Sequence, residues 1–511
     1  MAQNIDPEKG SPSTPDLEAS RSPPDISQED VAKDLTTSTD DFKSEEEPVY
    51  VEWDGPEDPQ NPQNWPLAKR MAHVILAGAT AFIANISSTA FAPAAELAGH
   101  EFNVDNETVA AFTVTIYLLG FALGPLVIAP LSEHYGRLII YSTCLTVATA
   151  FLIGCSEANN VRAFLACRLI TGIAGSGPGT IGGGTIADVM PKETRGRAMA
   201  VFAIGPLVGI GVGPLMGGFV AEYLGWRWIF RILYISTGTI FLLAVIFMRE
   251  TYAPVLLQRK AARQRKNTGN KALRSRFDEK GGALRALWHA VQRPTKMLLF
   301  SPIVWSLSIY CAFVWGLLIL LFTTLPAVYS GQYGFSPSIS GLTYIGMGVG
   351  MGVGAVGFGL LSDRVMKSRF GDQPAEWKPE GRLLLMAWFS IVLPVGFFWY
   401  GWSAAYSAPW ILPVLGTTFI GVGALFIMMP VQVYLVDSFG AATAASALAA
   451  NTVLRSLAGT FLPLGGSRLY QHLGLGWGNS LLGFIAVGFC IMPALFFKYG
   501  EWMRKKWPIN L

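Results

Sequence analysis

Twelve long apolar segments constrain this chain more than any other feature of its sequence. Each is long enough to cross the apolar core of a bilayer, which takes about 20 helical residues. The segments lie at residues 71–93, 108–130, 138–156, 163–187, 198–221, 227–248, 303–329, 340–361, 382–402, 409–436, 443–467 and 478–498. Backbone in lipid must satisfy its own hydrogen bonds, so the sequence predicts an all-α polytopic membrane protein with 12 transmembrane helices.

Charged residues divide the remainder of the chain. Residues 1–64 hold 17 acidic and four basic residues and are rich in Ser and Pro, a composition typical of a disordered tail. Residues 249–300, after the sixth span, hold 13 basic and three acidic residues. The predicted regions are a disordered acidic cytoplasmic tail (1–64), an N-terminal six-helix bundle (65–248), a basic cytoplasmic linker (249–300), a C-terminal six-helix bundle (301–505) and a cytoplasmic C-terminal end (506–511).

The orientation follows from the basic residues, which favour cytoplasmic loops. Lys and Arg are absent from the loops at 94–107, 330–339 and 401–408, and they are concentrated in 249–300. Arg162, Arg227 and Arg468 are scattered exceptions. We therefore expect both termini to be cytoplasmic.

A polar motif occurs at matching places in the two halves. "APLSEHYGR" (129–137) separates the second span from the third, and "GLLSDRVMK" (359–367) separates the eighth from the ninth. The repeat indicates two copies of one six-helix unit. A carboxylate near a helix end can pair with a guanidinium and with a neighbouring helix N-terminus, so the motif can act as a conformational latch. An ordinary charged turn is the alternative for either copy.

This arrangement resembles the major facilitator superfamily over residues 65–505, where the loop reads approximately G-x-L-[SAT]-[DE]-R-x-G-R-[RK]. The first copy departs from that pattern at Ala129, His134 and Leu138. The resemblance implies the major facilitator fold, with two six-helix pseudo-repeats. It assigns the latch to Glu133, Gly136, Arg137, Gly359, Asp363 and Arg364.

Two further motifs resemble those of proton-coupled members. "CRLITGIAGSG" places Arg168 and Gly172 at the R-x-x-x-G spacing of span four. An arginine inside a span is a functional candidate, and the resemblance implicates Arg168 in proton coupling; snorkelling to headgroups is the alternative. "GPLVGIGVGPLMGG" in span five resembles the antiporter motif and implies export by proton exchange. Its packing residues are Gly205, Pro206, Gly213, Pro214, Gly217 and Gly218.

Two stretches, 434–464 and 53–70, resemble fungal twelve-span drug:proton antiporters. That resemblance implies a multi-pass protein of the plasma membrane whose substrate binds at mid-membrane between the halves. Polar or aromatic residues at suitable depth are the candidates for lining this cleft, with helix packing as the alternative for each. They are Asn85, Tyr117, Trp315, Gln432, Asn451 and Arg455.

The leading interpretation is an exporter of small amphipathic organic compounds, whether drug, toxin or secondary metabolite, that works by proton antiport and alternating access. A transporter of polyamines or another polar solute, and a transport-dead receptor, are the alternatives. No group of residues suggests an enzyme, a cofactor, a metal site or nucleic-acid binding. We expect a monomer whose partners are substrate, protons and lipid. The proton carrier stays open, because Asp188, Glu222 and Asp437 lie near span ends and His73 is a weak candidate.

Overall fold

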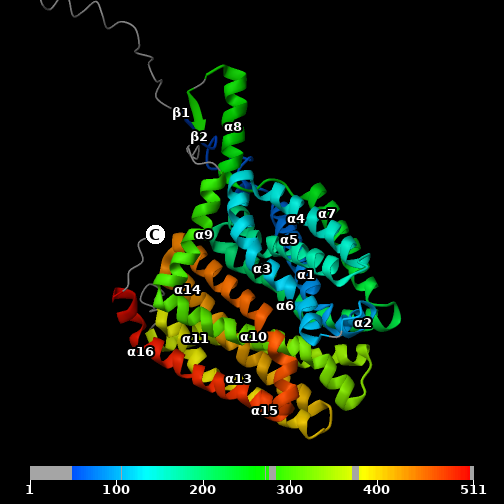
Figure 1. Cartoon of the computed structure of the whole chain (residues 1–511). Helices are drawn as coiled ribbons and strands as arrows, with labels where there is room; N and C mark the ends of the chain where they lie inside the picture. The colour runs from blue at the N-terminus through cyan, green and yellow to red at the C-terminus, as the bar shows by residue number, and fades with distance from the viewer. Residues whose placement is uncertain (1–48, 105, 271, 276–282, 371–378, 507–511) are drawn as a thin grey trace, which may run out of the picture. The chain divides into compact units, whose positions relative to one another are not determined.

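The structure is a computed structural model that describes residues 49–104, 106–270, 272–275, 283–370 and 379–506. Most of the tail predicted at 1–64 and nearly all of the predicted C-terminal end at 506–511 therefore lie outside the described residues. The same holds for part of the predicted linker. The described chain is almost entirely helical (Figure 1).

The chain forms two sets of helices joined by a third group of elements. The N-terminal helices are α1 (Leu67–Thr89), α2 (Ala95–Glu101), α3 (Glu107–Tyr135), α4 (Arg137–Ser156), α5 (Val161–Val189), α6 (Lys192–Tyr223) and α7 (Arg227–Phe247), with the 3-10 turns η1 (Pro62–Asn64) and η2 (Ala92–Ala94). The connecting elements are α8 (Ala253–Thr268), β2 (Leu273–Ser275), which pairs with β1 (Val49–Val51), and α9 (Ala283–Phe300).

The C-terminal helices follow. They are α10 (Pro302–Tyr333), α11 (Pro337–Phe370), η4 (Pro379–Arg382), α12 (Leu383–Phe389), α13 (Val392–Ala405), α14 (Ile411–Phe461), η5 (Leu462–Gly465), α15 (Gly466–Phe489) and α16 (Ile491–Lys506). We call the end of the bundle where α3 meets α4 the basic end, and the end where α3 begins the opposite end.

The predicted all-α membrane fold is confirmed, and the number of spans is close to the prediction. By length and hydropathy, ten stretches of the described chain qualify as spans. The helix α5 is not among them, although it has 29 residues. The predicted spans at 443–467 and 478–498 fall in one stretch, Thr443–Arg504, which is interrupted at Gly474, where φ is +71°.

The helix α14 also contains more than one predicted span. Its 51 residues would reach about 77 Å at the helical rise, against roughly 30 Å for the apolar core of a bilayer. Two separate candidate spans, Ile411–Phe439 and the beginning of Thr443–Arg504, divide it. It therefore carries the predicted spans at 409–436 and 443–467.

Small residues bring neighbouring helices into backbone contact. A Cβ added at Gly209 would lie 2.6 Å from the carbonyl oxygen of Phe82, and one added at Gly205 or Gly217 would meet the carbonyl oxygen of Gly78 or Ala90. Between residues 205 and 217 of α6, every fourth residue is therefore a glycine that faces α1. Three glycines of the predicted packing motif, Gly205, Gly213 and Gly217, lie on this face, whereas Gly218 faces α11. The prolines of the motif, Pro206 and Pro214, lie inside α6.

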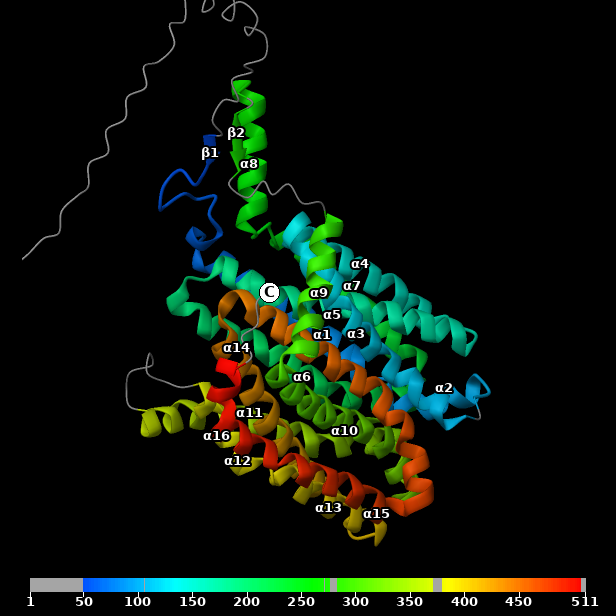
Figure 2. The same cartoon turned by 60° about the vertical axis from the view of Figure 1, so that its left-hand side comes forward.

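The N-terminal and C-terminal helices meet through α6 with α11 and through α3 with α14. A Cβ on Gly218 would lie 2.5 Å from the carbonyl oxygen of Pro337, and a Cβ on Gly341 would lie 2.9 Å from that of Pro214. The connecting helix α9 packs on both α3 and α14, and it can be followed in Figures 1 and 2.

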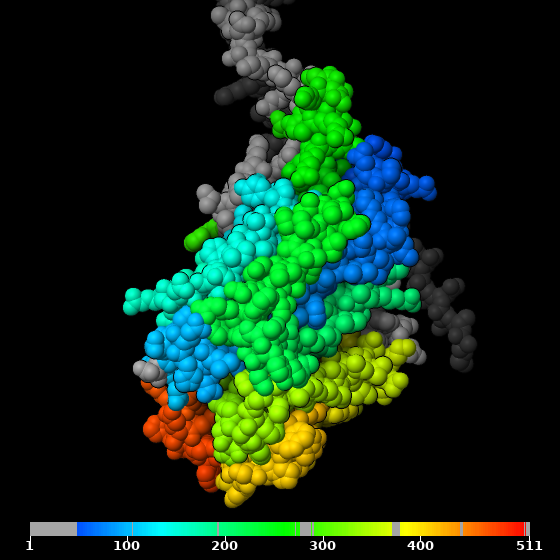
Figure 3. All heavy atoms as spheres, turned by 90° about the vertical axis from the view of Figure 1, so that its right-hand side faces the viewer, coloured from blue at the N-terminus to red at the C-terminus, as the bar shows by residue number. Residues whose placement is uncertain are grey.

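The segment before α1 is attached to α8. The N–H groups of Asp54 and Gln60 donate to the carboxylate of Asp58 over 2.9 and 2.8 Å. Lys260 of α8 pairs with Asp58 at 3.3 Å and with Asp54 at 2.7 Å. Figure 3 shows this segment in blue beside the green of α8. We call this arrangement the N-terminal clasp.

Candidate transport site

A cavity of about 580 Å³ lies between the N-terminal and C-terminal helices at the opposite end. One wall comes from η2, α2 and the beginning of α3, and the other from the end of α10 and from α15. Most of the lining is small, apolar or uncharged. Among the described lining residues, the charged ones are Glu96 and Glu107, and Glu107 accepts a hydrogen bond of 2.8 Å from Gln471. This volume is within the range of small-molecule sites, roughly 300–1,000 Å³.

The side chain of Arg168 lies directly behind the wall of this cavity. It is fully buried, and its guanidinium donates to the carbonyl oxygens of Ser87 at 2.9 Å, Val114 at 3.3 Å and Thr113 at 3.4 Å. The ring of Tyr117 lies 4.8 Å from its guanidinium carbon. Because Val114 itself lines the cavity, Arg168 joins α1, α3 and α5 just behind the lining.

A second intramembrane arginine, Arg455, has different surroundings. Its guanidinium carbon lies 4.9 Å from the centre of the Trp315 ring, and its Nε is enclosed without a hydrogen-bond partner. One turn away on α14, Asn451 is buried and donates to the hydroxyl of Ser308 over 3.4 Å. These residues connect α14 to α10.

The structure brings together only some of the residues predicted to line the cleft. Trp315 faces a small void of about 10 Å³ that shares Ala92 and Val114 with the cavity. Of the six predicted residues, none is among the described residues lining the larger cavity. Asn85 donates to Ala81 within α1, Tyr117 donates to the carbonyl of Ala84, and Gln432 is half-buried on α14.

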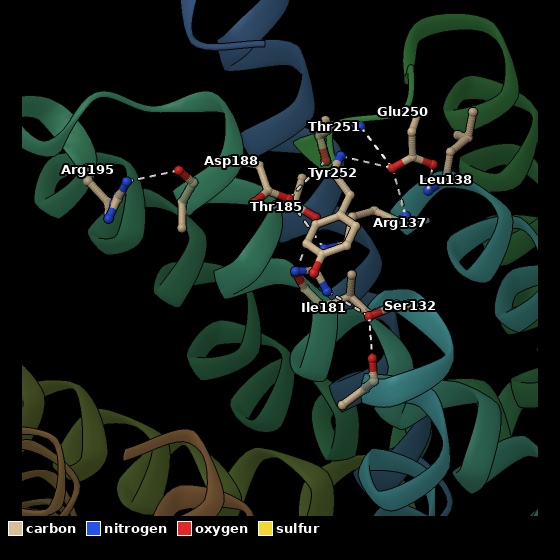
Figure 4. A network of polar contacts seen from close by, with 12 residues as sticks. Ser132, Arg137, Leu138, Ile181, Thr185, Asp188, Arg195, Glu250, Thr251 and Tyr252 are labelled. Carbon is tan, nitrogen blue, oxygen red and sulfur yellow. Dashed lines mark hydrogen bonds and ion pairs between the residues drawn. The ribbon is translucent and has the colours of Figure 1, made fainter. Parts of the chain in front are cut away.

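At the basic end, Arg137 is the centre of a polar network (Figure 4). Its side chain donates to the Ser132 hydroxyl at 2.7 Å and pairs with Asp188 at the end of α5 at 3.3 Å. The carboxylate of Glu250, which follows α7, accepts from the backbone N–H of Arg137 at 2.8 Å and of Leu138 at 3.3 Å. It thereby supplies acceptors for the first N–H groups of α4.

Gly136 allows this approach. Its φ of +102° ends α3, and a Cβ there would collide with the Glu250 carboxylate. Both a left-handed conformation and close contact therefore favour glycine at this position.

The C-terminal helices repeat the network with a different arginine. Arg382, immediately before α12, donates to the Ser362 hydroxyl at 2.8 Å and pairs with Asp437 at 3.3 Å. It also pairs with Asp363 at 2.9 Å. Ser132, Arg137 and Asp188 are thus matched by Ser362, Arg382 and Asp437. Arg504 of α16 pairs with Glu380 at 2.8 Å.

The predicted latch residues occupy unequal positions in these networks. Arg137, Gly136 and Asp363 belong to them, whereas Glu133 and Arg364 are exposed, and a Cβ on Gly359 would meet open space. The ion pairs of Arg137 and Arg382 each join helices of the same half. The sequence predicted Arg364 and not Arg382, because the arginine of the second motif was placed by its distance along the chain from the serine. The position of Arg382 at the start of the predicted span 382–402, like that of Arg137 just before the span 138–156, was the signal that could have found it.

The residues considered as proton carriers lie away from the cavity lining. Asp188 and Asp437 are paired with arginines at the basic end. Glu222 is exposed at the end of α6 and accepts from the N–H of Ser338 at 2.8 Å. His73 is buried; its Nδ1 lies 2.8 Å from the Lys69 carbonyl, and its Nε2 accepts from the N–H of Arg249 at 3.0 Å. Within the described residues, no three His, Cys, Asp or Glu side chains form a metal-binding group.

Comparisons with known proteins give the family. The family model described as Major Facilitator Superfamily matches residues 77–463. The MFS-type transporter mpsC of Macrophomina phaseolina is 59% identical, over 97% of this chain and 96% of that one. A trichosetin biosynthesis cluster MFS transporter of Gibberella fujikuroi is 46% identical over 93% of each chain.

Solved structures agree on the fold. The crystal structure of a D-xylose-proton symporter matches with a TM-score of 0.64 at 17% identity, covering 84% of this chain and 97% of that one. An inward-facing bacterial homologue of the human lysosomal transporter Spinster matches with a TM-score of 0.62 at 15% identity, over 87% and 100% of the two chains. The family match, the fungal relatives and the helical fold lead to one conclusion: the chain is a membrane transport protein that belongs to the Major Facilitator Superfamily.

Proposed function

We propose that this protein exports small amphipathic organic compounds, such as a drug, a toxin or a secondary metabolite, by proton antiport and alternating access. The observation that carries the proposal is the cavity of about 580 Å³ between the N-terminal and C-terminal helices. An alternating-access transporter holds its solute between two such sets of helices. A lining of small and uncharged residues suits a flat apolar molecule held by dispersion. The name of the Gibberella fujikuroi relative, which refers to a biosynthesis cluster, supports a secondary metabolite.

We place the protein in the plasma membrane as a monomer with both termini cytoplasmic, which makes the basic end the cytoplasmic one. Residues 65–248 and 301–505 then act as two bundles joined by the linker 249–300. The networks around Arg137 and Arg382 stabilise the cytoplasmic end of each bundle. The motif of α6 favours membership of the drug:proton antiporter group.

We assign proton coupling to Arg168, because it lies behind the cavity wall and contacts Val114 of the lining. Its five N–H donors can respond to a change in the charge or hydration of the cavity. A guanidinium stays protonated, so in this assignment Arg168 senses the proton and does not carry it.

The test uses cells that lack their own exporters and express this protein at the surface. Accumulation of fluorescent hydrophobic compounds is measured with and without a protonophore. Lower accumulation in expressing cells, abolished by the protonophore, is the expected result. Equal accumulation across the panel, with surface expression verified, would contradict export.

A polyamine transporter is the second candidate, and one observation favours it. The carboxylates of Glu96 and Glu107 both line the cavity, and polyamine recognition requires such acidic groups. A competition experiment distinguishes the two functions. If the protein exports amphipathic compounds, added spermidine should leave the export of a hydrophobic dye unchanged. Loss of dye export at micromolar spermidine would favour the polyamine function.

A further inference from the structure

One face of α14 is fitted to Trp315 of α10. Asn451, Arg455 and Gly459 follow at intervals of four residues, so they lie on one side of the helix. Asn451 bonds Ser308, Arg455 lies over the Trp315 ring, and a Cβ on Gly459 would be 2.9 Å from Cδ1 of Trp315. The same added Cβ would be 3.2 Å from Leu118 of α3. This face therefore lies where the N-terminal helices meet the C-terminal ones.

The two intramembrane arginines differ in how their donors are satisfied. Arg168 donates to three backbone carbonyls. Arg455 makes no hydrogen bond or ion pair within the part of the chain that the structure describes, and its Nε is enclosed. Arg455 is partly buried, and a charged group without a hydrogen-bonded or ionic partner is costly in such surroundings. This energetic cost applies to Arg455 and not to Arg168, whose guanidinium is hydrogen-bonded.

A small void touches both the lining of the cavity and Trp315. The void of about 10 Å³ next to Trp315 has an apolar lining that includes Leu118, Ile319 and Phe322. It shares Ala92 and Val114 with the cavity. Trp315 lines this void and also lies against the guanidinium of Arg455. Trp315 is therefore the residue that links the edge of the cavity to Arg455.

We propose that Arg455 binds an acidic group of the exported compound, so that the substrate class is amphipathic organic anions. The carboxylate or enolate of such a molecule pairs with the guanidinium fork, and its flat apolar part packs against Trp315. This inference rests on the proposed export function and names the substrate class.

The experiment measures binding to the purified full-length protein in lipid nanodiscs. The probes are matched sets built on several flat scaffolds, such as 1-pyrenebutyrate, its methyl ester and the corresponding pyrenyl butylamine. Wild-type protein should bind the acid at least about tenfold more tightly than the ester, as expected for one charged hydrogen-bonded pair. Arg455→Gln should lose that preference and keep its affinity for the ester. Arg455→Lys, which keeps the charge without the fork, should retain part of the preference.

Arg162→Gln is the matched control, because it removes one exposed arginine from α5. It should bind the acid as the wild type does, and unfolding temperatures show whether each variant is folded. The inference would be overturned if wild type and Arg455→Gln showed the same preference for the acid, or if no probe set showed such a preference. Displacement of the acid by chloride alone would overturn it as well. Proton-driven uptake of the same probes into vesicles separates the two proposals. Absent uptake by wild type contradicts export, whereas uptake without acid preference contradicts only the role of Arg455.

Discussion

Arg168 is a charged residue whose donors serve the structure as well as the coupling role that we propose for it. It is fully buried and joins α1, α3 and α5 through backbone carbonyls. Arg168→Ala removes hydrogen bonds donated by a charged group, each of which contributes about 1.5–3 kcal/mol. We expect a clearly lower unfolding temperature in detergent. A variant with the wild-type unfolding temperature would contradict the structural part of this role.

The carboxylate of Glu250 has an equally local role at the basic end. It accepts from the N–H groups of Arg137, Leu138, Thr251 and Tyr252. Glu250→Ala removes these acceptors and should destabilise the protein by about 1–3 kcal/mol, the cost of leaving buried donors unpaired. Thermal unfolding measures the change.

The control for this prediction is Glu133→Ala, which removes an exposed glutamate from the last turn of α3. Its unfolding temperature should stay near that of the wild type. Equal destabilisation by the two variants would mean that lost negative charge at this end, and not the contacts of Glu250, explains the effect.

At the scale of elements, the contact between α6 and α1 depends on glycine. Gly209→Leu would place a side chain against the Phe82 carbonyl and Asn85, and overpacking of this kind costs about 1–3 kcal/mol or more. We expect a reduced yield of folded protein, measured by size-exclusion chromatography after detergent extraction. Gly352→Leu, where an added Cβ meets open space, should be tolerated. Normal yield of the Gly209 variant would show that these helices can separate without loss of the fold.

The N-terminal clasp should respond to acid through Asp58. Hydrogen bonds from the Asp54 and Gln60 N–H groups, with Lys260, hold the pKa of the Asp58 carboxyl below its usual range. A lowered pKa in the folded state stabilises the clasp above the unfolded value of about 3.9, and the effect is lost as pH falls through the folded value.

Asp58→Asn should therefore expose the segment before α1 to protease at neutral pH, where wild type is protected. Wild type should become sensitive only below about pH 4, where the carboxyl begins to titrate. Glu57→Gln, at an exposed neighbouring site, should behave as wild type. Protection of the Asp58 variant equal to wild type at pH 7 would show that its charge does not hold the clasp.

At the scale of the whole molecule, the sequence was sufficient to predict the membrane-spanning helices and insufficient to predict the contacts between them. Hydropathy identifies a span because each must be apolar over bilayer thickness, whatever its partner. The pairing of Arg382 with Asp437 depends on where the chain returns after residues 371–378, and no local pattern encodes that distance. The different surroundings of Arg168 and Arg455 likewise depend on which carbonyls neighbouring helices bring within reach. The cavity lies nearer the opposite end than the predicted mid-membrane cleft because α2, η2 and α15 form its walls.

The central claim is that the two sets of helices move an organic compound outward at the expense of a proton gradient. The most direct measurement places purified protein in liposomes with an imposed pH gradient and follows transport of a fluorescent amphipathic acid together with internal pH. We expect the compound to enter the liposomes against its concentration gradient only when the lumen is acidic. Protons should then leave the lumen as the compound enters. Equal uptake with and without the pH gradient would contradict proton-driven transport. So would loss of the pH gradient without accumulation of the compound.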